Sequence, residues 1–86
     1  MIHHFVYIIH NLSSDTFYKG YSLDPSKRLI QHNNGCASFT SRFYPWELVY
    51  VEAFNNKCEA LQREKKLKKY SKKQLRNLIA SPKNIL

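Results

Sequence analysis

Two tyrosines on neighbouring strands are the first residues of this chain that could do chemistry. The β-prone runs 5–9 and 16–20 flank a short polar segment and predict a hairpin with a loop, carrying Tyr7 in one strand and Tyr18 in the other. The strand period places Tyr18 on one face with Gly20, which has no side chain to cover a neighbour. The pair could be a reactive site made of two phenols or two aromatics of a small core, and the hairpin alone favours the core.

Arg28 and His32 form a second candidate, because residues four apart lie one above the other on a helix. Asp24 as N-cap, Pro25 in the first turn and Gly35 after the last turn predict a short helix around them. A guanidinium next to an imidazole could hold a phosphate and move a proton. The alternative is an exposed polar edge, which the pair alone favours.

Glu64 is the third candidate and lies in a helix that we expect to begin at Lys57. At 100° per residue, Leu61 and Leu67 fall in the apolar arc and Glu64 falls between them, so its carboxylate should point toward the sheet. An unpaired charge there would be costly unless a cation, a metal or a hydrogen-bond network met it. The alternatives are a carboxylate that reaches water at the margin of the arc, or an ion pair with Arg28.

The remaining elements complete an α+β pattern. Residues 46–54 are rich in β-branched and aromatic residues and apolar on both faces, which predicts the central strand. Residues 36–45 lack a period and are expected to form a loop. A last helix should start at Ser71 as N-cap and end before Pro82. The expected order is therefore strand, strand, helix, strand, helix, helix.

Length and composition limit the classes of protein to consider. We expect one domain over residues 1–86, with room only for a small core. No apolar run approaches the roughly 20 residues of a spanning helix, and the first ten residues lack the features of a signal peptide, so a cytoplasmic protein is expected. Cys36 and Cys58 are read as reduced thiols, and the four histidines lack a metal-ligand spacing.

The charge balance points to a polyanionic partner. Lys and Arg number 14 against 6 Asp and Glu, a formal charge of +8 at pH 7, which makes nucleic acid the first candidate and an anionic membrane the second. Eight of the 14 basic residues lie between Lys57 and Lys73. They could be the solvated face of two helices or a phosphate-binding surface, and Arg42 beside Phe43 and Tyr44 adds charge and stacking surface.

Five short motifs in this order resemble the GIY-YIG nuclease domain, most closely its small single-domain bacterial branch. They are V-Y-I (6–8), Y-K-G (18–20), R-L-I-Q-H-N (28–33), P-W-E-L-V-Y (45–50) and E-A-L-Q-R-E-K-K-L-K (59–68). The resemblance extends from Phe5 to about Ile79. It implies a three-stranded antiparallel sheet flanked by helices, and hydrolysis of phosphodiesters with one divalent metal, Mg or Mn.

The resemblance also implies roles for the candidate residues. Tyr7 and Tyr18 correspond to the tyrosines of the first and second triplets, one of which, ionised, is thought to activate water. Arg28 matches the helix arginine of the family, and His32 stands where members often carry His or Tyr. Glu64 matches the single carboxylate that ligates the metal.

Two positions depart from the family pattern. The first triplet is V-Y-I, with its tyrosine shifted by one place, which blurs the face on which Tyr7 lies. Lys19 stands where the family has an apolar residue, and it indicates either a partly open sheet face or an additional basic group near the phosphates.

The sequence therefore predicts a metal-dependent endonuclease that acts on DNA, with RNA as an alternative substrate, in repair or processing. It should be directed by structure rather than by sequence, with a protein partner as a source of specificity. The alternative is a nucleic-acid-binding adaptor with weak or no activity. The residues expected to contact nucleic acid are Lys19, Arg42, Arg63, Lys65, Lys66, Lys68 and Lys69.

Overall fold

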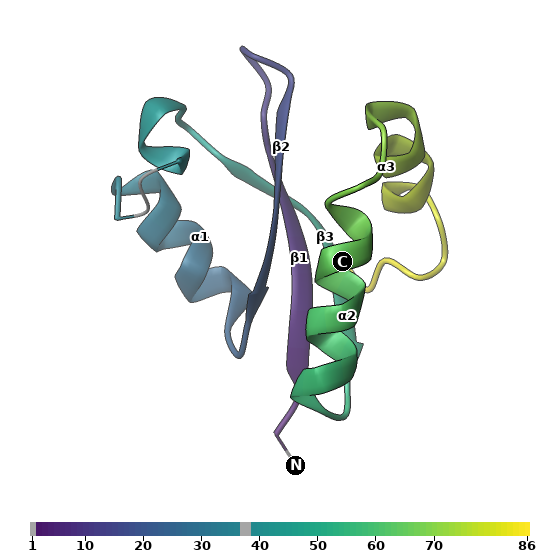
Figure 1. The fold of residues 1–86 in the computed structure, drawn as a ribbon. Helices are drawn as coiled ribbons and strands as arrows, with labels where there is room; N and C mark the ends of the chain where they lie inside the picture. The colour runs from purple at the N-terminus through teal and green to yellow at the C-terminus, as the bar shows by residue number, and fades with distance from the viewer. Residues whose placement is uncertain (1, 37–38) are drawn as a thin grey trace.

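The computed structural model describes residues 2–36 and 39–86. In chain order its elements are β1 (His4–Asn11), β2 (Thr16–Ser22), α1 (Pro25–Asn33), the 3-10 helix η1 (Thr40–Arg42), β3 (Glu47–Phe54), α2 (Lys57–Leu67) and α3 (Lys72–Ile79) (Figure 1). This order confirms the predicted α+β class, and η1 is the one addition, inside the segment expected to be a loop. None of the helices in the described ranges is long and apolar enough to cross a membrane.

The three strands form one antiparallel sheet with β1 in the middle, in the order β2-β1-β3. The prediction that the strand at 46–54 is central was wrong, because in the described part of the chain β3 pairs only with β1. β3 is apolar on both faces for another reason. Val51 packs into the core on one side of the sheet and Tyr50 into the core on the other, so helices rather than strands cover it.

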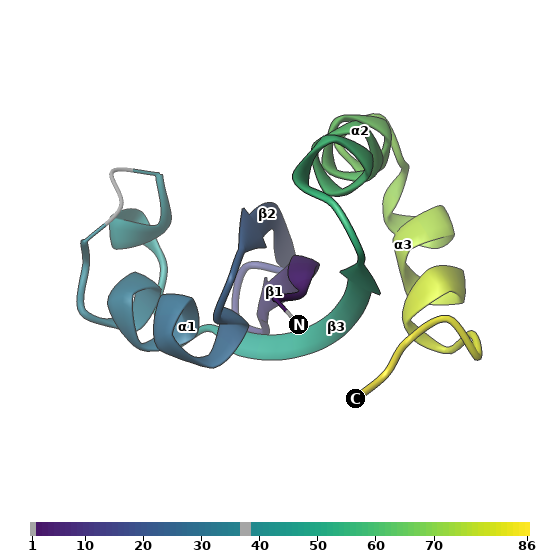
Figure 2. The same ribbon diagram turned by 90° about the horizontal axis from the view of Figure 1, so that it is seen from below.

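The sheet separates two layers of helices (Figure 2). On one side lies α1, and on the other lie α2 and α3. Successive residues of β1 alternate between the two cores: Val6 and Ile8 face α2 and α3, whereas Tyr7 and Ile9 face α1. The first tyrosine is therefore buried on the side of the sheet that carries α1.

The helix ends follow their capping residues. Asp24 accepts a hydrogen bond from the Lys27 amide at 3.1 Å, and Ser71 forms a reciprocal capping box with Gln74. Gly35, with φ of 75°, follows the last turn of α1. The predicted caps of α1 and α3 are confirmed.

Asp15, at the tip of the hairpin, forms ion pairs with α3. His10 hydrogen-bonds one carboxylate oxygen at 2.9 Å, and Arg76 and Lys72 pair with the other. The hydrogen bond from His10 and the Arg76 guanidinium hold the pKa of Asp15 at about 2, below its usual range. These contacts orient the exposed end of β2 relative to the last helix.

Gly20 lies opposite Tyr7 in the β1–β2 register, and the tyrosine ring extends over it. A Cβ atom on Gly20 would lie 2.5 Å from both Cζ and the hydroxyl oxygen of Tyr7, closer than atoms tolerate. The missing side chain therefore makes room for the Tyr7 ring to reach across β2.

We expect Gly20→Ala to lower the free energy of unfolding by about 1–3 kcal/mol, because the added methyl group overpacks a filled space. Urea denaturation measures this change. Gly35→Asn is the matched control: its backbone has φ of 75°, which Asn tolerates, and the nearest atom to its Cβ is 3.9 Å away. Equal stability of Gly20→Ala and the wild type would contradict this placement of the ring.

Candidate active site

A buried chain of hydrogen bonds joins β1, α1 and η1. The Tyr7 hydroxyl lies 2.8 Å from Nε2 of His32, and Nδ1 of His32 lies 2.7 Å from the Thr40 hydroxyl. His32 and Thr40 have no exposed surface, and Tyr7 has 1%. The Trp46 indole donates to the Thr40 carbonyl at 3.0 Å, which holds η1 against the start of β3. Both ring nitrogens of His32 are thus satisfied without water.

Burial sets the protonation states of the side chains in this hydrogen-bonded group. It lowers the pKa of His32 to about 4, with the Arg28 charge acting in the same direction, so His32 is neutral at pH 7. Burial also raises the pKa of Tyr7, whose phenol stays protonated. For a protonated phenol beside a neutral imidazole, we assign the Tyr7 hydroxyl as the donor to Nε2 and place the imidazole proton on Nδ1, which then donates to Thr40.

Tyr18 stands at the outer side of this chain. Its ring centroid is 4.9 Å from that of His32 and 6.5 Å from that of Tyr7. Tyr18 is half-buried, whereas Tyr7 is 1% exposed, so Tyr18 is the more accessible of the two phenols. The two phenols predicted from the hairpin thus lie together on one side of the sheet.

Arg28 lies one turn before His32 on α1 and is half-buried. Its guanidinium donates to the Gln31 side chain at 2.7 Å, and its interaction with Tyr7 partly offsets the rise in the pKa of that phenol. The predicted helix face is correct, and it is turned toward the sheet. The exposed-edge interpretation does not hold for His32, which is fully buried.

Glu64 lies on α2, which covers the other side of the sheet from α1. Its side chain is 17% exposed, and its negative charge contributes to raising the pKa of Tyr7, so the carboxylate lies within electrostatic range of the phenol. Within the described part of the chain, its ion pair is with Lys68 at 3.4 Å rather than with Arg28. The carboxylate is therefore half-buried and paired with a lysine that is itself 58% exposed.

The donor set around Glu64 suits a weakly held metal. No group of three His, Cys, Asp or Glu side chains that could hold a metal occurs among residues 2–36 and 39–86. Mg²⁺ usually keeps several waters and binds through one or two carboxylates together with substrate phosphates. A single carboxylate of Glu64 fits that manner of binding.

The residues predicted to contact nucleic acid fall into different environments. Lys65, Lys66 and Lys69 are exposed on or just after α2, and Arg42 is exposed on η1. Arg63 is different, because its side chain is 12% exposed and its Nε pairs with Glu52 at 3.1 Å. Arg63 is therefore held in an ion pair with Glu52 of β3, whereas Lys65, Lys66 and Lys69 are exposed.

Sequence reasoning missed Thr40 as a site residue. Thr40 lies in a segment without a period, eight residues beyond His32, and nothing in the spacing connects the two. Only the path of the chain through η1 brings its hydroxyl to the imidazole.

The depressed pKa of His32 predicts a loss of stability in mild acid. An unfolded imidazole binds a proton below a pH of about 6.5, whereas folded His32 resists protonation down to about 4, so protons favour the unfolded state between these values. The free energy of unfolding should fall by about 2 kcal/mol between pH 7 and pH 5 from this group alone. Urea denaturation at both pH values, compared with His32→Gln, isolates this contribution since His3, His4 and His10 are common to both proteins. An identical pH slope in the variant would contradict the neutral, buried imidazole.

Comparisons with known proteins identify the family of this chain. The family described as "GIY-YIG catalytic domain" matches residues 3–77. The chain is 43% identical over 77 residues to a UPF0213 protein of Staphylococcus epidermidis, covering 88% of this chain and 93% of that protein. It is 41% identical over 78 residues to a UPF0213 protein of Clostridium perfringens, covering 90% and 83%.

A solved structure is similar as well. The solution NMR structure of the UPF0213 protein BH0048 from Bacillus halodurans superposes with a TM-score of 0.59 at 30% identity, covering 94% of this chain and 86% of that chain. The family match over residues 3–77, the similar relatives and the similar fold lead to one conclusion. The chain belongs to the GIY-YIG family.

Proposed function

We propose that this protein is a metal-dependent endonuclease that hydrolyses phosphodiester bonds in DNA. Membership of a nuclease family supports the reaction class. The observation that carries the proposal is the convergence on one hydroxyl group. His32 hydrogen-bonds the Tyr7 hydroxyl, and Arg28, Tyr18 and Glu64 each act on its pKa.

In this proposal Tyr7 and His32 act together as the general base. The Tyr7 oxygen takes a proton from the attacking water while its own proton passes to Nε2 of His32, 2.8 Å away. The imidazolium that forms has both N–H groups satisfied, by Tyr7 and by Thr40. Tyr18, half-buried beside them, is the other phenol that could meet the water.

Arg28 would couple this base to the substrate. Its positive charge contributes to the low pKa of His32, which makes the imidazole a weak base in the free protein. A phosphodiester bound to the guanidinium would neutralise that charge, so the pKa of His32 would rise as substrate arrives. The same contact would stabilise the negative charge that builds on the phosphate.

Glu64 is the residue that would hold Mg²⁺ or Mn²⁺. Such an ion polarises a phosphoryl oxygen and stabilises the leaving oxygen. Lys68, which pairs with Glu64 at 3.4 Å, competes with a cation for the carboxylate. Substrate phosphate would draw Lys68 away, so we expect the metal to bind well only together with nucleic acid.

The exposed lysines of α2 would hold DNA through its phosphates, without reading the sequence. We therefore propose structure-directed cleavage in repair or processing in the cytoplasm, with a protein partner adding specificity. The ion pair between Glu64 and Lys68 also suits a second candidate, a binding adaptor in which the carboxylate never takes a metal.

Replacing each tyrosine separately identifies the base. We expect Tyr7→Phe to slow single-turnover nicking of DNA by about 100-fold or more, the order expected for loss of a general base. It should also cost about 1–3 kcal/mol of stability, because Nε2 of His32 loses its buried partner. Tyr18→Phe should keep its stability and lose less activity. A loss of activity confined to Tyr18→Phe would transfer the role of base to that phenol.

Replacing the Glu64 carboxylate distinguishes the proposed endonuclease from the alternative, a binding adaptor. Glu64→Gln should abolish cleavage supported by Mg²⁺ or Mn²⁺ while leaving DNA affinity in EDTA unchanged, because the exposed lysines remain. Glu47→Gln, which removes an exposed carboxylate from β3, is the control with the same change of charge. Nicking assays and fluorescence anisotropy measure the two properties. Undiminished cleavage by Glu64→Gln would defeat the assignment of this residue.

A further inference from the structure

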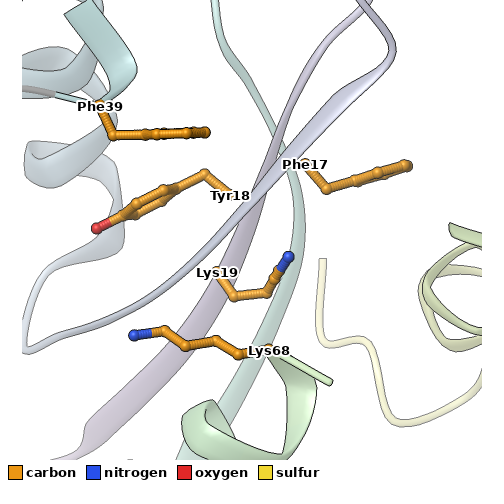
Figure 3. A pocket seen from close by; sticks show the side chains of 5 residues that line it. All are labelled: Phe17, Tyr18, Lys19, Phe39 and Lys68. Carbon is orange, nitrogen blue, oxygen red and sulfur yellow. The ribbon is translucent and has the colours of Figure 1, made fainter. Parts of the chain in front are cut away.

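A small pocket opens beside Tyr18, outside the hydrogen-bond chain of Tyr7. Its volume is about 220 Å³. Figure 3 shows the side chains that line it: Phe17, Tyr18, Lys19, Phe39 and Lys68. The volume is below the roughly 300–1,000 Å³ of sites for drug-sized ligands, so the pocket suits one small planar group.

The pocket follows the outer edge of β2. Phe17, Tyr18 and Lys19 are consecutive, so their side chains alternate between the faces of the sheet, yet all three line the pocket. Among residues 2–36 and 39–86, β2 pairs only with β1, and its other edge has no strand neighbour. The pocket therefore extends around the strand edge, between Phe39, which precedes η1, and Lys68 at the end of α2.

Phe39 places an exposed aromatic ring at the pocket. Its side chain is 49% exposed, and its ring lies over that of Tyr18 with centroids 6.0 Å apart and planes at 28° (Figure 3). An exposed aromatic ring supported from behind by a second ring is a stacking platform, and nucleobases stack on such rings whatever their sequence. A base in a duplex is covered by its neighbours, so only an unpaired base could offer its face.

Two lysines supply positive charge at the same pocket. Burial lowers the pKa of Lys19, and the nearby charge of Lys68 lowers it further, so the two ammonium groups repel each other. A phosphate placed between them would relieve that repulsion. Lys68 also pairs with Glu64. This ion pair connects the pocket to the candidate active site.

We propose that this pocket holds one unpaired nucleotide, with its base stacked on Phe39 and its phosphate between Lys19 and Lys68. The proposal rests on the proposed nuclease function and names its substrate class, namely DNA with a single-stranded segment at the cleavage site. Because Tyr18 belongs both to the pocket and to the cluster around Tyr7, a nucleotide in the pocket brings its neighbouring phosphate to the catalytic groups.

Binding of short oligonucleotides in EDTA tests the pocket without any cleavage. The probes are single-stranded dT12, a 12-mer of abasic sites with the same phosphates, and a 12-base-pair duplex, each measured by fluorescence anisotropy. Wild-type protein should bind dT12 at least about fivefold more tightly than the abasic strand, the lower end of what one stacked base contributes. Phe39→Ala should lose that preference and keep its affinity for the abasic strand and the duplex.

Ile30→Ala is the matched control, because Ile30 is an apolar side chain of α1 that is 61% exposed and does not line the pocket. It should bind all three probes like the wild type. A preference for dT12 that survives in Phe39→Ala, or that is absent from the wild type, would overturn the proposal that the pocket holds an unpaired nucleotide. A wild type that prefers dT12 but cleaves no DNA with Mn²⁺ would instead overturn the nuclease function while the pocket stands, so the two failures are distinguishable.

Discussion

The hydrogen bond between the Tyr7 hydroxyl and His32 is the interaction on which this site depends. It joins the central strand to α1 where both side chains are almost completely buried, so each group finds its partner inside the protein. Gly20 leaves the space for the phenol, and Thr40 satisfies the second nitrogen of the imidazole. Hairpin, helix and η1 are thereby positioned relative to one another by one polar chain.

The electrostatics of the site follow from the same burial. Burial disfavours charge, so the imidazole is neutral and the phenol is protonated in the free protein. Burial lowers the pKa of His32 to about 4, the Arg28 charge acts in the same direction, and Arg28 is also the group that we propose binds a phosphate. In this proposal His32 is a weak base in the free protein. It would become a stronger base only when DNA binds, so cleavage would depend on binding of DNA.

Local patterns in the sequence predicted much of the fold, and they failed where tertiary packing decides. Capping residues such as Asp24 and Ser71 act within one turn, so the helices they begin were predicted correctly. The helical period also correctly predicted that the side chain of Glu64 points toward the sheet, and it placed His32 on the face of α1 that is buried. The double-sided apolar pattern of β3 was misread as a central strand, because helices can cover both faces of an edge strand. Thr40 and Phe39 join their sites only through the path of an aperiodic segment.

The protonation of His32 is the most direct test of this account. Two-dimensional ¹⁵N–¹H NMR of the imidazole nitrogens reports which nitrogen carries the proton and at what pH the ring becomes charged. The account predicts a proton on Nδ1, a bare Nε2 that accepts from Tyr7, and a ring that remains neutral down to a pH of about 5, given a pKa of about 4. A proton on Nε2 at pH 7, or titration at the ordinary value of about 6.5, would contradict it.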